Sequence, residues 1–365
     1  MKKLLAVSVL FALLTGAAFA QLTFSGGVET GVQMRFGTAY EDPNSPQFTI
    51  RNFDVNGGAR LNLNGAFTHS SGTAGGNFQL RVDYANGTNA LQNRQAWLWY
   101  QPMDMLRIHV GKLDGDGFGT GSRLDVSNDV GGSTGIHFRI TPMDGLRVGL
   151  TLTNNNAENS SINTLDLRFG FVYTMAGTFR LAANVALNDL ANSTSGAAKP
   201  INMAFGLNVL ALADMGITAL SVDAAMNNIG VDGVDPTINL GQRLTFAKDA
   251  ISVTEELRID DITNKATDFM SIRLHLNGSY KIDTITAGLA VGFGLNRMSG
   301  TDPRAWDGTG GAATEDYNTL VINPYVTFPL AGPNVTIGYG ANVGMPKDGD
   351  TVMNHAIYVN FSIGF

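Results

Sequence analysis

The chain has 365 residues, of which 44% are hydrophobic, 15% are charged and 44 are glycine. Its 24 basic residues against 31 acidic ones give a net charge of −7, which disfavours nucleic acid as a partner. The absence of cysteine excludes a disulfide scaffold, a thiolate metal site and a cysteine nucleophile.

The first twenty residues have the pattern of a targeting signal. A positive start at Lys2 and Lys3 is followed by an apolar run of about eleven residues and by the small-x-small motif "AFA". The run is too short to cross a hydrocarbon core of about 30 Å. We therefore expect residues 1–20 to be a cleaved secretory signal and residues 21–365 to form one domain.

From residue 22 onward, apolar and polar side chains alternate with a period of two. The stretch "LTFSGGVETGVQMRF" (22–36) shows the pattern, and "TLDLRFGFVYT" (164–174) and "MSIRLHLNGSYKI" (270–282) repeat it. Alternation over ten or more residues predicts long strands with one apolar face. Strands that cross a bilayer need about 9–11 residues, whereas ordinary globular strands average five or six. A soluble β-sandwich also alternates, but it does not need so many long apolar faces.

The connections between the expected strands alternate between short and long. Short turns such as 142–145 and 281–283 separate longer polar segments such as 113–132 and 297–317. This meander, without a helical period, predicts an all-β fold that consists of a single transmembrane antiparallel β-barrel of about 16–18 strands. The last strand, "AIYVNFSIGF", should close against the first, because a bilayer tolerates no unpaired strand edge.

The polar face of each strand should line the interior of the barrel. Many inward positions are glycine or other small residues, which cannot fill a barrel of this width, so an aqueous lumen is expected. Trp97 is the only tryptophan expected inside, and Trp99 is assigned to an aromatic girdle near the strand ends. The basic positions expected on one inner wall are Arg60, Arg81, Arg94, Arg107, His109, His137, Arg139, Arg147, Arg168 and Arg180.

The acidic, glycine-rich segment 113–132 is expected to follow the fifth strand as the third long loop. A Ca²⁺ loop would need a late bidentate glutamate, and a phosphate loop would need a GK[ST] motif before a helix; the segment has neither, so we expect no metal and no cofactor. Acidic side chains opposite a basic wall favour a loop that folds inward and constricts the pore. Its charged residues are Asp114, Asp116, Arg123, Asp125 and Asp129.

Two segments resemble porins. "RQAWLWYQPMDMLRIHVGKLDGDGFG" (94–119) is similar to the strand–turn–strand entry into the third loop of the porins of Gram-negative outer membranes. "FTIRNFDVNGGARLNLNG" (48–65) resembles an early strand of the phosphate-type porins, although Asn52 stands where the second of two adjacent basic residues is usual. The resemblance implies a third loop folded into the barrel, a homotrimer and a location in the bacterial outer membrane.

We therefore expect a porin, a water-filled channel through which small hydrophilic solutes and ions diffuse passively. The expected partners are these solutes, outer-membrane lipid and a homotrimer of the chain, with no nucleic acid. The alternatives are a substrate-specific channel for a sugar or an anion, and a barrel whose surface loops act as an adhesin or antigen. An enzyme is not expected, because the five histidines are scattered along the chain.

Overall fold

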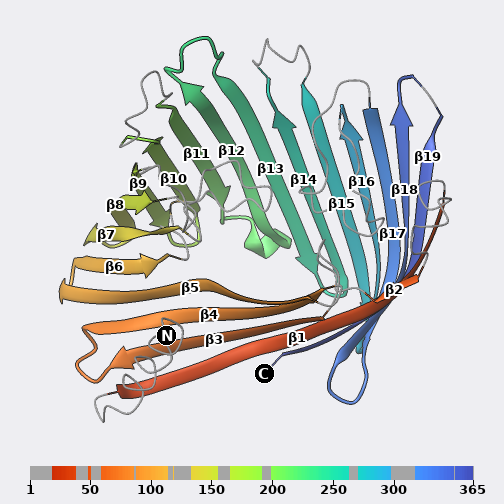
Figure 1. The fold of residues 1–365 in the computed structure, drawn as a ribbon, viewed down its shortest axis with the longest axis horizontal. Helices are drawn as coiled ribbons and strands as arrows, with labels where there is room; N and C mark the ends of the chain where they lie inside the picture. Colours follow the sequence, from red (N-terminus) through yellow and green to blue (C-terminus); the bar gives the residue numbers. More distant parts are fainter. Residues whose placement is uncertain are drawn as a thin grey trace.

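The structure of the chain is a computed structural model, and its described residues form one sheet of antiparallel strands (Figure 1). The described residues are 19–37, 48–50, 59–85, 88–113, 118, 133–154, 165–190, 199–262, 270–296, 317–348 and 350–364. Among them, no helix is long and apolar enough to span a membrane.

The strands follow one another along the chain, with one short 3₁₀-helix, η2 (Ala213–Met215), before β12. Their bounds are β1 (Phe19–Gly37), β2 (Phe48–Ile50), β3 (Ala59–His69), β4 (Ala74–Ala85), β5 (Thr88–Met103), β6 (Leu106–Lys112), β7 (Thr134–Met143), β8 (Leu146–Asn154), β9 (Asp166–Met175), β10 (Phe179–Leu187), β11 (Ile201–Val209), β12 (Ile217–Ile229), β13 (Thr237–Lys248), β14 (Ile251–Asp260), β15 (Ser271–Ile282), β16 (Ile285–Leu295), β17 (Tyr317–Pro329), β18 (Asn334–Pro346) and β19 (Val352–Gly364).

The sheet closes on itself. From β3 to β19 each strand pairs with the next one along the chain, and β1 pairs with β3 on one edge and with β19 on the other. The closing register runs from Gly27 opposite Gly364 to Gly37 opposite Asn354. The three-residue β2 lies against β1 on the same edge as β3, so the circle contains eighteen strands. The predicted closed barrel is confirmed, with the larger of the two strand numbers.

The two faces of the strands differ as the alternation predicts. On β15, Leu276 is 40% exposed on the outside, whereas Arg273 is 4% exposed and His275 is 8% exposed on the inside. The pattern recurs around the barrel, where exposed leucine, isoleucine, valine and phenylalanine point outward and buried polar groups point inward. The outer surface is therefore suited to hydrocarbon and the inner surface to water.

The two rims also differ. Short turns, such as the two-residue Asp249-Ala250 and Asp283-Thr284, form one rim. The other rim carries the long connections, together with the two-residue connection between β4 and β5. Asp249 and Asp283 have φ angles of 53° and 55°, a left-handed conformation that aspartate tolerates better than most residues. The segment between β6 and β7 is the third connection on the long-loop rim and follows the fifth barrel strand, as the sequence predicts.

Inward glycines make room for tyrosine rings that lie along the wall. Tyr325 on β17 lies over Gly288 on β16, where an added Cβ would stand 2.3 Å from the ring, and its hydroxyl donates to Asn277 on β15 at 3.1 Å. Tyr358 on β19 crosses Gly338 in the same way and donates to Asn323 at 2.9 Å. These side chains tie strands that are two positions apart.

The assignment of the faces predicts the cost of a charge on each one. Leu276→Arg places a cation on the outer face of β15 and should lower the free energy of unfolding by about 2–4 kcal/mol. Thr254→Arg, on the inner face of neighbouring β14, is the matched control and should cost less than about 1 kcal/mol. Urea unfolding in lipid vesicles measures both, and equal losses would contradict the assignment.

Candidate functional site

The inner wall is the candidate site, because it gathers nearly all the buried charged side chains that the structure describes. A polar hollow of about 490 Å³ lies between β1, β3, β4 and β19, and Glu29, Gln79 and Arg81 are among its lining residues. Gln79 donates to Asn64 on β3 at 2.8 Å. Arg60 lies opposite Glu29 in the register of β3 and β1, so an acid and a base face the lumen side by side.

The histidines of β6 and β7 meet inside the barrel. His109 lies directly opposite His137, with ring centroids 5.4 Å apart. The indole of Trp97 stacks on His109 at 4.8 Å, and the Nδ1 atom of His137 lies 2.9 Å from the Thr151 hydroxyl. Both imidazoles are nearly buried, so these aromatic side chains form a packed band on the wall.

Four arginines form a basic cluster between this band and the short-turn rim. Arg107, Arg147 and Arg180 are each the second residue of their strands β6, β8 and β10, and Arg139 on β7 lies opposite Arg107. Arg139 lies close enough to Arg107 and Arg147 for their charges to repel. Within the described part of the chain, neither Arg107 nor Arg139 forms an ion pair.

The sequence assignment of Trp99 to an outer girdle was wrong. Trp99 points into the lumen like Trp97, and the Arg107 guanidinium lies 4.3 Å from its ring centre. Arg107 also donates to the Gln101 side chain at 2.8 and 3.1 Å. Trp97 and Trp99 are two residues apart, so the period of two places both inside; the proximity of Trp99 to the strand end does not decide its face.

Phe118, from the connection between β6 and β7, is fully buried inside the barrel. Its ring packs with Val172 and Ala182 and makes an edge contact with His137 at 5.6 Å between centroids. The Asn184 side chain donates to the Phe118 carbonyl oxygen at 3.3 Å. Burial of a phenylalanine side chain stabilises a fold by about 1.5–3 kcal/mol, so this contact holds a loop residue firmly on the wall.

The remaining predicted wall residues, Arg168 and Arg94, differ in their positions in the sheet. Arg168 on β9 is 2% exposed and lies opposite Thr151 in the register. Arg94 lies in β5 where the register with β4 shifts by one residue, and its side chain is outside the described residues. The five predicted loop residues also lie outside the described residues; they are Asp114, Asp116, Arg123, Asp125 and Asp129.

The opposite wall carries acids that are paired. On β14, Asp260 contacts Arg258 at 2.5 Å and Arg273 of β15 at 3.0 Å. Glu256 lies 3.4 Å from Arg243 of β13 and 3.7 Å from His275. The alternation predicts which of these residues face inward, but not the register that pairs them. No group of three or more histidine, aspartate or glutamate side chains able to hold a metal lies within the described residues.

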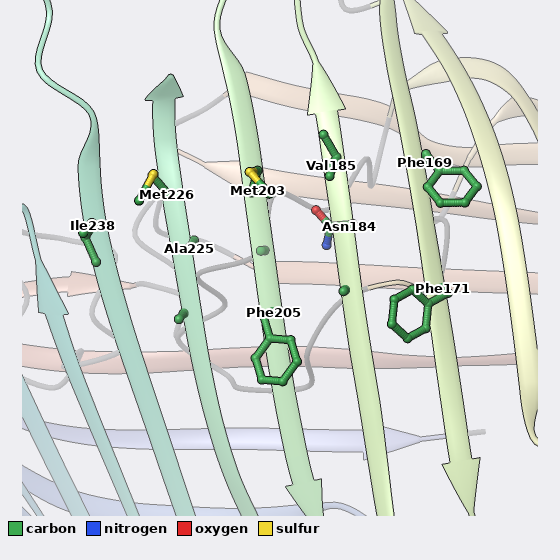
Figure 2. Close-up of a pocket in the computed structure, with 12 residues that line it drawn as sticks. Phe169, Phe171, Asn184, Val185, Met203, Phe205, Ala225, Met226 and Ile238 are labelled. Atoms are coloured by element: carbon green, nitrogen blue, oxygen red, sulfur yellow. The ribbon is translucent and has the colours of Figure 1, made fainter. Parts of the chain in front are cut away.

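A second hollow lies outside the barrel, over β9 to β13 (Figure 2). It has a volume of about 450 Å³, and Phe169, Met203 and Phe205 border it while small side chains such as Ala183 and Ala224 form its floor. Its lining is almost entirely apolar. It therefore suits hydrocarbon rather than a hydrophilic solute, and the lumen remains the candidate site.

A closed transmembrane barrel with an apolar outside and a charged, hollow inside defines an outer-membrane channel protein. The sequence model described as Gram-negative porin matches residues 6–323, and the chain belongs to that family. It is a channel of the bacterial outer membrane that passes small hydrophilic solutes. No curated protein sequence matches the chain.

Solved structures share the fold. OccD3 (OpdP) of Pseudomonas aeruginosa has a TM-score of 0.55 and 8% identity over 96% of this chain and 93% of its own. OccAB3 of Acinetobacter baumannii has a TM-score of 0.57 and 10% identity over 95% and 100% of the two chains. OpdK of P. aeruginosa, solved with vanillate, has a TM-score of 0.56 and 8% identity over 96% and 100%. At these identities the likeness concerns the fold.

The paired acids predict a stability effect. Asp260→Asn removes the carboxylate that Arg258 and Arg273 share, and it should lower the free energy of unfolding by about 3 kcal/mol, because Arg273 remains buried as a cation. Asp283→Asn, in an exposed left-handed turn position, is the matched control and should have little effect. Urea unfolding of the two variants in lipid vesicles measures the difference; equal stabilities would show that the pairing contributes nothing.

Proposed function

We propose that the segment between β6 and β7 narrows the lumen and makes the channel a sieve for small hydrophilic solutes. The observation that carries the proposal is Phe118, a residue of this segment that lies fully buried on the inner wall. In the proposal, the acidic side chains of Asp114, Asp116 and Asp125 face the basic wall and create a transverse field. Such a field orients dipolar solutes and penalises apolar ones.

Other charged residues also contribute to the transverse field of the proposed sieve. Asp129 adds to the acidic side, and Arg123 partly balances it within the loop. In the proposal, the positive end of the transverse electric field comes from basic residues of the opposite wall, which are Arg81, Arg94, Arg139 and Arg168. No bond is made or broken in this mechanism, so the chain acts as a channel and not as an enzyme.

We infer an anion preference from the cluster of Arg107, Arg139, Arg147 and Arg180. Asp223 lies near enough to Arg180 to offset part of its charge. Arg107 and Arg139 have no ion pair within the described part of the chain, so their positive potential extends into the lumen. A unit charge on the wall changes the Coulomb energy of an ion about 10 Å away in water by about 0.4 kcal/mol. This energy changes the local concentration of that ion roughly two-fold. OpdK, which shares the fold, was solved with vanillate, an organic anion, and this agrees with the proposed preference.

The proposed assembly follows from the targeting signal and the family. Residues 1–20 direct export and are removed, and residues 21–365 insert into the outer membrane. The apolar outer face contacts lipid acyl chains, which also fill the hollow of Figure 2. Three copies associate as a homotrimer.

Deletion of residues 114–129 tests the sieve. The deletion should raise single-channel conductance in planar bilayers and admit larger uncharged solutes, because the proposed obstruction is gone. The wild-type channel provides the reference and should open in discrete steps. An unchanged conductance and size limit would reject the constriction.

The combined variant Arg107→Ala, Arg139→Ala and Arg147→Ala tests the anion preference. The reversal potential in a KCl gradient should move toward cation preference, by roughly two-fold in permeability ratio per charge at low salt. The variant Lys199→Ala, Lys248→Ala and Lys281→Ala removes the same charge from exposed positions and should leave the reversal potential near the wild-type value. Equal shifts in the two variants would show that the lumen cluster has no special role.

A further inference from the structure

Phe118 fits into a notch that two glycines create in the inner wall. A Cβ atom added at Gly149 on β8 would stand 2.5 Å from the ring of Phe118, and one added at Gly170 on β9 would stand 2.6 Å from it. Real Cβ atoms do not approach a ring so closely, so only glycine at both positions admits this side chain. The ring and the notch are therefore matched in shape.

Besides the two glycines, residues of three strands contact Phe118. His137 of β7 touches the ring from one side, Val172 of β9 and Ala182 of β10 pack against it, and Asn184 of β10 donates to its carbonyl oxygen. Both the side chain and the backbone of this single residue are thus held. Closer to β6, the amide of Leu113 donates to the Ser133 carbonyl at 2.9 Å and joins the two ends of the connection.

We propose that Phe118 is the positioning residue that anchors the segment between β6 and β7 to the lumen wall and so sets the bore of the channel. The inference rests on the proposed sieve, because an anchor matters only if the segment narrows the pore. Phe118 itself does not contact the solute in this arrangement. It acts by fixing the point at which the connection between β6 and β7 meets the wall.

Phe118→Ala tests the anchor because it empties the notch without changing any charge. Single-channel conductance should rise by about 1.3-fold or more, and open-channel current noise should increase, because the segment is no longer held. Phe118→Leu keeps an apolar side chain in the notch and should restore most of the wild-type behaviour. Phe169→Ala, on the outer face of β9 beside Gly170, is the matched control and should leave conductance unchanged.

A cysteine pair gives a reversible version of the experiment, and the chain has no cysteine of its own. A Cβ at Gly170 would lie 3.0 Å from the Cβ of Phe118, close to the separation of about 3.5–4.5 Å in a disulfide. The double variant Phe118→Cys with Gly170→Cys should conduct like the wild type when oxidised. Reduction with dithiothreitol should then raise its conductance and noise toward those of Phe118→Ala.

The outcomes separate the anchor from the channel function. If the wild type gives no discrete conductance steps, the proposed function fails whatever Phe118 does. If the wild type conducts but Phe118→Ala has the same conductance and noise, and reduction of the cysteine pair changes nothing, the anchor is wrong and the sieve can still stand. A Phe118→Ala chain that does not fold leaves the decision to the cysteine pair, whose oxidised form keeps the tether.

Discussion

The structure depends on one constraint, which is that no strand edge can remain unpaired in a bilayer. The pairing of β1 with both β3 and β19 meets this constraint, and it fixes the remaining architecture. A closed circle of eighteen strands encloses a lumen too wide for wall side chains to fill. The same closure makes every strand two-faced, so the sequence must alternate between hydrocarbon-compatible and water-compatible residues. The channel is thus a consequence of how the backbone satisfies its hydrogen bonds.

Charges on the inner wall are stabilised in two different ways. On β13 to β15, each buried acid has a basic neighbour. The paired charges largely cancel one another within the wall, so this side adds little electrostatic potential to the lumen. On β6 and β7, Arg107 and Arg139 lie opposite one another, and water and mobile ions must offset the repulsion between them. The first arrangement mainly supports the wall. The second leaves a potential in the lumen, which is where selectivity among ions can arise.

The period of two predicted most of the architecture, but it could not predict contacts between distant segments. It placed His109 and His137 on adjacent strands, and the closure of the last strand on the first followed from membrane physics. The period also placed Trp99 inside with Trp97, and the assignment of Trp99 to an outer girdle was wrong because it relied on nearness to a strand end instead. The ion pairs of Asp260 depend on strand register, which alternation does not encode. The sequence could not predict that Phe118 is buried on the inner wall, since an isolated aromatic residue in a glycine-rich loop belongs to no periodic pattern.

The high glycine content gains a specific meaning from these contacts. Glycine on an inner face was expected to keep the lumen open by being small, yet Gly288 and Gly338 are covered by tyrosine rings from neighbouring strands. A ring packed over glycine adds stiffness to the wall. Gly149 and Gly170 apply the same geometry to a ring from a loop instead of a strand. The shape of the wall thus determines where that loop can be held, and the width of the pore follows from packing as well as from charge.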